Sequence, residues 1–156
     1  MNDPGLLAEI ADGSIAGNLR LDEGFLHAMN GRNIEGVMAC FLNTLDLVVV
    51  LDGSVLQGPE ALRRCLAELF AEVRTLHLDI IEISRWSIGE TVFAVGIAKC
   101  QLEALDGSKR RLKVCWTDAR RQVAGRWVYV LDHATNISGR RPPTTNESWI
   151  GTRVES

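Results

Sequence analysis

The sequence predicts an α+β fold, in which three N-terminal helices pack against a cone-shaped, curved antiparallel sheet made of a four-stranded meander and a short hairpin. Three observations lead to this prediction. Apolar residues have helical spacing in the first half of the chain, the spacing changes to a period of two in the second half, and turn signals divide that second half into strands. Helices that precede a run of strands are typical of a sheet with its helices on one face.

The composition is that of one globular domain. The chain has 156 residues, of which 46% are hydrophobic and 24% charged, so it can bury a substantial core. We expect the main domain over residues 21–138, after an N-terminal arm with helical character over residues 1–20. Pro142-Pro143 disfavours regular structure near the end of the chain, so residues 139–156 are expected to form a tail.

The charge pattern argues against nucleic-acid and membrane partners. The net charge is -3, and the Lys and Arg residues are spread along the chain instead of forming a basic face. The longest apolar run, Leu47 to Leu51, is far below the roughly 20 residues of a membrane-spanning helix. The N-terminus has acidic residues where a signal peptide has basic ones, so we expect a cytoplasmic protein.

The sequence contains the four cysteines Cys40, Cys65, Cys100 and Cys115. None of them has the spacing of a zinc site, and each lies among apolar residues. They are expected to be reduced thiols in the core. We expect neither a metal site nor a cofactor.

The predicted helices and the hairpin begin and end at specific residues. Gly31 separates the first helix, which carries Phe25, from a second short helix that Asn33 can cap. Asp52-Gly53 marks the turn of the hairpin, and Gly58-Pro59 opens the third helix because proline suits a first helical turn. The apolar stripe of the third helix contains Ala61, Leu62, Cys65, Leu66, Leu69, Phe70 and Val73.

The meander begins at Thr75. Its turn signals are Gly89-Glu90, Asp106-Gly107 and Ala124-Gly125. The apolar phase changes between Ile80 and Ile81, which indicates a β-bulge. Because of that bulge, the sequence leaves open the directions of Glu82, Arg85 and Trp86.

Three stretches carry a resemblance to a known group of proteins. FLHAMNGRNIEGVMACF resembles its opening helices, LDGSVLQGPEALRR resembles its glycine before the third helix, and GRWVYVLDHATN resembles its final strand. Over residues 25–136 the sequence is similar to the nuclear-transport-factor-2-like (NTF2-like) superfamily, in particular to its SnoaL-like and ketosteroid-isomerase-like members. The resemblance implies a cone-shaped fold that is usually dimeric, with a cavity that serves isomerases, cyclases, dehydratases, ligand carriers and association domains.

The catalytic residues of ketosteroid isomerase are not matched. That chemistry needs a carboxylate base, together with a tyrosine and a protonated aspartate that stabilise the enolate. The resemblance places the tyrosine at Phe25, the aspartate at Thr117, and the base at Val49 or near Leu51. Because neither donor is retained, the sequence argues against a steroid-type isomerase.

The dipeptide Asp132-His133 has the composition of a catalytic pair, but strand geometry separates its members. A two-residue turn at Ala124-Gly125 sets Thr117 opposite Asp132 and Trp116 opposite His133. Neighbouring residues of a strand point to opposite faces of the sheet. We therefore do not expect Asp132 and His133 to form a dyad.

We expect the cavity on the sheet face that carries the smaller side chains, which include Ala98, Cys115, Thr117 and Asp132 if Asp106-Gly107 is also a two-residue turn. Asp132 among apolar neighbours should have a raised pKa and serve as a general base or acid. The alternative is a structural aspartate, either bonded to the Thr117 hydroxyl or solvated near the mouth of the cone. The predicted ligand-binding residues are Thr117, Phe25, Trp86 and Cys115, with core packing as the alternative for Phe25 and Trp86.

The face with the larger side chains has no helix left to cover it. It would be an exposed apolar patch unless a second subunit buried it. We therefore expect a homodimer formed through the sheets. The predicted interface residues are Trp116, Trp127, Tyr129 and His133.

Two functions compete. The first is a small-molecule-binding protein, either a carrier or a cofactor-independent enzyme that transfers protons on an apolar carbonyl or polyketide-like ligand. In that enzyme Asp132 would be the base and Thr117 its hydrogen-bond partner. The second is a non-catalytic homodimerisation or association module.

Overall fold

The computed structural model describes residues 12–139, so residues 1–11 of the expected arm and residues 140–156 of the expected tail lie outside the described part of the chain. The first helix, α1 (Asp12–Asn30), runs through residue 20. The expected boundary between arm and domain therefore falls inside a helix.

The three predicted helices are confirmed: α1, α2 (Ile34–Met38) and α3 (Pro59–Glu72). α1 ends just before Gly31, as the sequence indicates. Asn33 caps α2, because its side-chain oxygen accepts a hydrogen bond from the Gly36 amide at 3.0 Å. Pro59 stands in the first turn of α3. None of the helices in the described residues is long and apolar enough to span a membrane.

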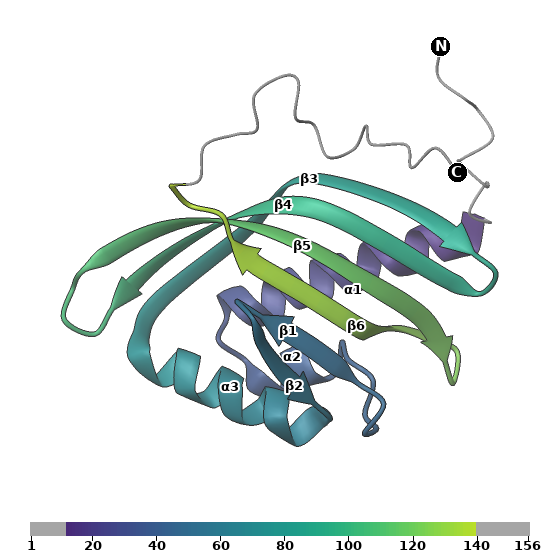
Figure 1. Cartoon of the computed structure of the whole chain (residues 1–156), viewed down its shortest axis with the longest axis horizontal. Coiled ribbons are helices and arrows are strands. Elements are labelled where there is room, and N and C mark those ends of the chain that lie inside the picture. Colours follow the sequence, from purple (N-terminus) through teal and green to yellow (C-terminus); the bar gives the residue numbers. More distant parts are fainter. Residues whose placement is uncertain (1–11, 140–156) are drawn as a thin grey trace, which may run out of the picture.

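The sheet is built from β1 (Val48–Leu51), β2 (Ser54–Gln57), β3 (Val73–Ile88), β4 (Thr91–Ala104), β5 (Lys109–Val123) and β6 (Arg126–Asn136). Their spatial order is β2-β1-β6-β5-β4-β3, which contains the predicted hairpin and the predicted meander. β1 pairs with β6 in parallel, so the sheet is mixed and not wholly antiparallel as expected. The long strands curve over α1, and α3 lies at one end of the sheet (Figure 1). We call the sheet face toward α1 the cavity face and the opposite one the outer face.

The register between β4 and β5 differs by one residue from the prediction. Asp106-Gly107 is part of a three-residue loop, 105–107, because the Ala104 amide donates to the Ser108 carbonyl at 2.9 Å. Gly107 closes this loop with a φ of 84°, a conformation that suits glycine. Trp116 therefore lies opposite Gly96, the position that the two-residue turn assigned to Thr117.

The turn between β5 and β6 has the predicted two residues, Ala124 and Gly125, and Val123 pairs with Arg126. Further along, a bulge shifts the register, since Arg120 pairs with Tyr129 and Ala119 pairs with Leu131. Val130 is the extra residue of this bulge.

The two shifts reverse the predicted faces of β5 and of the first part of β6. Beyond the bulge, Asp118 lies opposite Asp132 and Thr117 lies opposite His133. The expectation that Cys115 and Thr117 face the cavity is wrong, because they alternate with the inward residues of β5. The assignment of large aromatic residues to the outer face is also wrong for Trp116, Trp127 and Tyr129, which lie on the cavity face.

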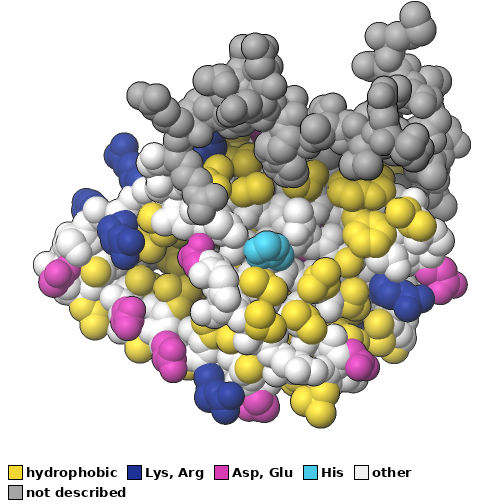
Figure 2. Space-filling view, in the orientation of Figure 1, with side chains coloured by type: hydrophobic (Ala, Val, Ile, Leu, Met, Phe, Trp, Pro, Cys, Tyr) yellow, Lys and Arg dark blue, Asp and Glu magenta, His cyan; other side chains and the backbone are white. Residues whose placement is uncertain are grey.

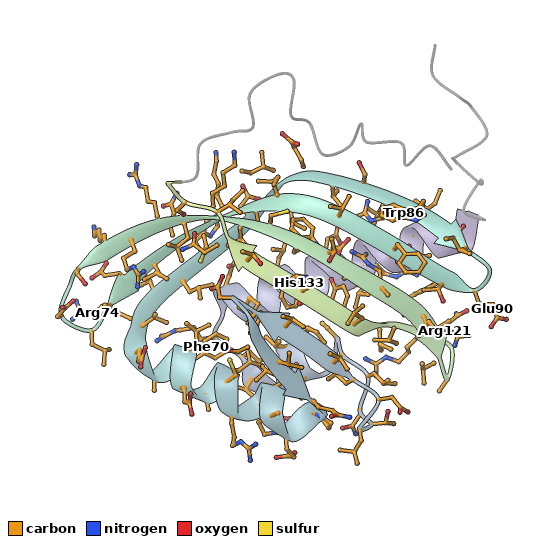
Figure 3. All side chains as sticks on the ribbon, viewed as in Figure 1. Phe70, Arg74, Trp86, Glu90, Arg121 and His133 are labelled. Carbon is orange, nitrogen blue, oxygen red and sulfur yellow. The ribbon has the colours of Figure 1, made fainter. Side chains whose placement is uncertain are left out.

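The remaining face assignments agree with the prediction. β4 turns its small residues Ala94, Gly96 and Ala98 toward the inside of the cone. The predicted bulge in β3 lies at Ile81, between the pairs that Ile80 and Glu82 form with β4. His133 is exposed on the outer face (Figure 3).

The main core lies where α1, α2 and α3 meet the hairpin and β6. Its buried members include Val37, Phe41, Leu47, Val49 and Leu62. Phe25, Phe41 and Tyr129 pack edge to face or tilted, with ring centroids 5.1 to 6.0 Å apart. This core closes one end of the cone. A space remains between α1 and the cavity face of the sheet, and it is described next.

Candidate functional site

A cavity of about 160 Å³ lies between α1 and the cavity face of the sheet. Most of its wall is apolar. α1 contributes Phe25, Leu26 and Met29, and the strands contribute Leu78, Ile80 and Val114. The long strands β3 to β6 curve over α1, and the cavity lies on the concave side of the sheet (Figure 1).

Three carboxylates line the cavity: Asp22 of α1, Asp118 of β5 and Asp132 of β6. Asp22 lies one helical turn before Phe25, so both point from α1 toward the sheet. Asp118 and Asp132 are cross-strand neighbours. Two polar aromatic residues, Trp116 and Tyr129, complete this end of the cavity.

Arg120 holds two of the three carboxylates. It is fully buried, its Nε and Nη2 donate to Asp118 at 2.7 and 2.9 Å, and its Nη1 donates to Asp22 at 2.9 Å. Burial alone would lower the pKa of Arg120, but the hydrogen bonds to Asp118 and the charges of Asp118 and Asp22 raise the pKa above its usual value. The guanidinium is therefore charged, and it lies behind the carboxylates.

Asp22 is the centre of a second set of contacts. Its carboxylate accepts hydrogen bonds from Arg85 of β3 at 2.5 Å and from the Tyr129 hydroxyl at 2.7 Å. Burial and the charge of Asp22 raise the pKa of Tyr129 well above its usual value, so the hydroxyl keeps its proton and remains a donor. Arg120 also lies over the Tyr129 ring, with Cζ 5.1 Å from the centroid.

Asp118 receives a further donor from the indole. Trp116 Nε1 donates to Asp118 Oδ2 at 3.0 Å. Burial raises the pKa of Asp118, while the bonds from Arg120 and Trp116 act in the opposite direction. Gly96 leaves room for the indole, because a Cβ atom at that position would lie 2.3 Å from Trp116 Cη2.

Asp132 is the carboxylate without a cation. Among the described residues it forms no ion pair, although it lines the same cavity as Asp22 and Asp118. Burial, followed by the negative charge of Asp118, raises the pKa of Asp132 to about 7. The His133 amide and the charge of Arg120 oppose this rise. Asp132 can therefore both accept and donate a proton near neutral pH.

The structure brings together only some of the predicted site residues. Phe25 and Asp132 line the cavity, whereas Thr117 is exposed on the outer face and Cys115 lies beside it there. Trp86 also lies on the outer face, where it stacks on Phe93 with centroids 5.8 Å apart and the rings 19° from parallel (Figure 3). The roles of Phe25 in binding and Asp132 in catalysis stay predictions.

Trp116 and Tyr129 were expected at a dimer interface and instead belong to the cavity. Trp127 packs against α1, since a Cβ atom at Gly17 would lie 2.4 Å from Trp127 Cδ1. Of the four predicted interface residues, His133 alone lies on the outer face. A role for His133 in an interface stays a prediction.

The site also contains residues that the sequence reasoning missed: Asp22, Arg85, Asp118 and Arg120. Asp118 and Arg120 are two residues apart, the spacing of side chains on one face of a strand. Asp22 precedes Phe25 by three residues, a helical spacing. These spacings are the signals in the sequence that could have identified the site. Oppositely charged residues on one face of an apolar strand, such as Asp118 and Arg120, indicate a buried ion pair. Within residues 12–139 no group of His, Cys, Asp and Glu side chains is arranged to hold a metal ion.

Comparison with known proteins identifies the fold. No family model and no curated protein matches the sequence. Solved structures do match, and one is a candidate dehydratase of the NTF2-like family from Streptomyces avermitilis, which superposes with a TM-score of 0.73 at 17% identity over 83% of this chain and 99% of that one. The chain has an NTF2-like fold.

Two further solved structures with a similar fold carry different names. A ketosteroid isomerase-like protein from Erwinia carotovora matches with a TM-score of 0.69 at 18% identity, over 81% of this chain and 98% of that one. A candidate calcium/calmodulin dependent protein kinase II association domain from Xanthomonas campestris matches with a TM-score of 0.70 at 13% identity, over 88% and 96% of the two chains. At these identities the likeness establishes the NTF2-like fold and leaves the activity to the residues of the cavity.

Proposed function

We propose that this NTF2-like protein binds an apolar small molecule in its cavity and exchanges a proton with that molecule through Asp132. The observation that carries the proposal is the contrast among the three cavity carboxylates. Asp22 and Asp118 are ion-paired with arginines, while Asp132 has no cationic partner within residues 12–139 and a pKa of about 7. A general base or acid is most effective when its pKa lies near the working pH.

The paired carboxylates have a positioning role in this proposal. Asp22 and Asp118 connect α1, β3, β5 and β6 through Arg85, Arg120 and Tyr129. Such a hydrogen-bonded network fixes the width of the cavity at its polar end. Thr117 has no part in it, because it lies on the outer face.

The ligand class follows from the wall of the cavity. Leu26, Met29, Leu78, Ile80 and Val114 offer an apolar surface to a ring or a branched chain. Asp132 then removes a proton from the ligand when it is ionised and returns one when it is protonated. Compounds with an acidic C–H group next to a carbonyl group, the class expected from the sequence, are suitable substrates for this step.

The test is hydrogen–deuterium exchange on a panel of ring ketones such as cyclohexanone, measured by NMR in deuterated buffer. The native protein should accelerate exchange over buffer, and Asp132→Asn should lose this acceleration by roughly 10²-fold or more. Asp79→Asn is the matched control, because Asp79 is an exposed aspartate on the outer face of β3 and its substitution should leave the rate unchanged. Native exchange no faster than buffer, or exchange unaffected by Asp132→Asn, contradicts the catalytic part of the proposal.

The second candidate is homodimerisation or association through the outer face. Its support is the apolar character of that face, where hydrophobic side chains gather around the histidine at the centre of Figure 2, which Figure 3 labels as His133. The apolar outer-face residues include Val50, Trp86, Phe93, Val95, Ile97 and Leu131. A face of this kind is suited to a second copy of the chain. The two candidates are compatible, because the cavity and the outer face lie on opposite sides of the sheet.

A further inference from the structure

The polar groups that face the cavity are almost all hydrogen-bond acceptors. The guanidinium of Arg120 is fully buried behind Asp22 and Asp118. Arg85 donates to Asp22 through Nη2, and although its buried Nε has no partner among the described residues, Arg85 does not line the cavity. The two uncharged donors of the cavity wall are also engaged, because Tyr129 donates to Asp22 and Trp116 donates to Asp118. A ligand therefore meets carboxylate oxygens and finds no unengaged N–H group on the described side chains of the wall.

The charges at this end of the cavity do not cancel when Asp132 is ionised. Three carboxylates, Asp22, Asp118 and Asp132, then lie near two guanidinium groups, Arg85 and Arg120. The excess is one negative charge, and it resides on Asp132. In a cavity with apolar walls this charge is poorly screened, so it attracts a cation and repels an anion strongly.

Aromatic rings lie beside the carboxylates. Phe25, Trp116 and Tyr129 line the cavity together with Asp22, Asp118 and Asp132. The faces of aromatic rings attract organic cations, and aromatic cages bind quaternary amines. One face of the Tyr129 ring already lies under Arg120, so Phe25 and Trp116 are the rings left for a ligand. Both features favour the same sign of ligand charge.

The volume limits the ligand to about one ring. The cavity measures about 160 Å³, and an apolar cavity of about 150 Å³ in a protein interior accommodates benzene. A steroid or another fused-ring molecule would extend beyond this volume.

We propose that the ligand of this cavity is a single-ring-sized apolar molecule that carries a protonated amine, with the ammonium group beside Asp132. This inference deepens the proposed function, since it takes the same cavity as the binding site, but it does not depend on catalysis. Carboxylate and phosphate ligands are disfavoured, because their charge would lie next to Asp132 and Asp118, and the described lining residues include no cation to neutralise it.

The test compares benzylamine, benzyl alcohol and benzoate, which share a ring and differ in charge, by isothermal titration calorimetry on the whole protein at pH 8. Benzylamine should bind at least tenfold more tightly than benzyl alcohol and still more tightly than benzoate. At pH 5.5 the advantage of the amine over the alcohol should shrink, because Asp132 becomes protonated. The other charged and titratable groups around Asp132 are Asp22, Asp118, Arg85, Arg120 and Tyr129. Ion pairs hold Asp22 and Asp118 to the two arginines, and burial raises the pKa of Asp118 and of Tyr129.

Two variants separate the contributions. Asp132→Asn should bring the affinities for amine and alcohol at pH 8 to within about twofold, while Asp79→Asn, which removes one negative charge from the outer face, should keep the preference for the amine.

Equal binding of amine and alcohol by the native protein, or tighter binding of benzoate, overturns the inference. Absence of binding by all three molecules overturns both this inference and the cavity as a ligand site. Amine binding without Asp132-dependent exchange on ketones contradicts only the proposed catalysis.

Discussion

Asp118 of β5 lies directly opposite Asp132 of β6, and both side chains line the same cavity. Like charges at opposing positions of an antiparallel pair repel each other. Arg120 neutralises Asp118 through two hydrogen bonds and forms no ion pair with Asp132. The cross-strand pair therefore divides into a carboxylate that holds the structure together and a carboxylate that titrates near neutral pH.

Substitution of Asp118 tests this division. In Asp118→Asn the negative charge opposite Asp132 is lost, so the pKa of Asp132 should fall below its native value of about 7. The variant should also be less stable by about 3 to 5 kcal/mol, because Arg120 stays buried with one partner fewer. Carbon NMR titration of the aspartate carboxyl groups measures the first effect, and urea denaturation measures the second. An unchanged pKa of Asp132 would contradict the coupling between the two carboxylates.

The raised pKa of Asp132 predicts a cost to stability at higher pH. Its folded-state pKa of about 7 exceeds the unfolded value of about 3.9, so the folded state binds the proton more strongly. This group therefore contributes stability below about pH 4, and the contribution is lost as the pH rises to about 7. Asp132→Asn avoids the charged form and should be more stable than the native protein at pH 8 by roughly 2 to 4 kcal/mol. The two proteins should be nearly equal at pH 4.

The control for this comparison is Asp79→Asn, whose exposed carboxylate lies on the outer face. Its free energy of unfolding should differ from that of the native protein by a similar small amount at both pH values. Urea denaturation at pH 4 and pH 8 gives the necessary differences. A stability gain at pH 8 in Asp79→Asn as large as that in Asp132→Asn would exclude burial as the cause.

Most of the fold could be predicted from the sequence, and two local features explain why the site could not. The order of elements and the turn at Ala124-Gly125 follow from apolar periodicity and turn residues. Asp106-Gly107, however, suits both a two-residue turn and a three-residue loop that ends in a left-handed glycine. The choice between them decides which way Trp116 points. The indole packs against Gly96, and this contact favours the three-residue loop. Local sequence signals do not contain such a contact.

The bulge at Val130 is the other feature. It reverses the directions of Trp127 and Tyr129 relative to Asp132. The buried contact between Tyr129 and Asp22 joins residues 107 positions apart in the chain, so a pattern confined to β6 does not contain it. Asp132 was placed on the correct face because it lies beyond the bulge, where the predicted and observed faces of β6 agree.

Gly96 should control the position of Trp116. In Gly96→Ala the new methyl group would lie 2.3 Å from Trp116 Cη2 and 2.4 Å from the Glu82 carbonyl oxygen, which belongs to the backbone of β3. The indole must move toward the cavity, and the variant should be destabilised by about 1 to 3 kcal/mol. Benzylamine affinity should fall with the loss of volume.

Gly24→Ala is the matched control, because nothing lies within 4 Å of its added methyl group, and it should stabilise α1 by about 0.5 to 1 kcal/mol. Unchanged ligand affinity in Gly96→Ala would separate Trp116 from the binding site.

The outer face gives the last prediction, which concerns the oligomeric state. Leu131 lies on this face between Val48 and Ala119, and it is 42% exposed in the single chain. If two copies associate through their sheets, symmetry places two copies of each substitution in one interface. Leu131→Glu should then raise the dimer dissociation constant by about 100-fold or more, because an unpaired carboxylate would be buried twice. Leu105→Glu is the control, since Leu105 is 60% exposed in the β4–β5 loop, away from the centre of the face.

Sedimentation velocity distinguishes the two variants, and equal dissociation constants for both, or a monomeric native protein, would contradict association through this face. Because Asp132 faces the other way, ligand binding by the Leu131→Glu monomer should be retained, which makes the outer face and the cavity separable in one experiment.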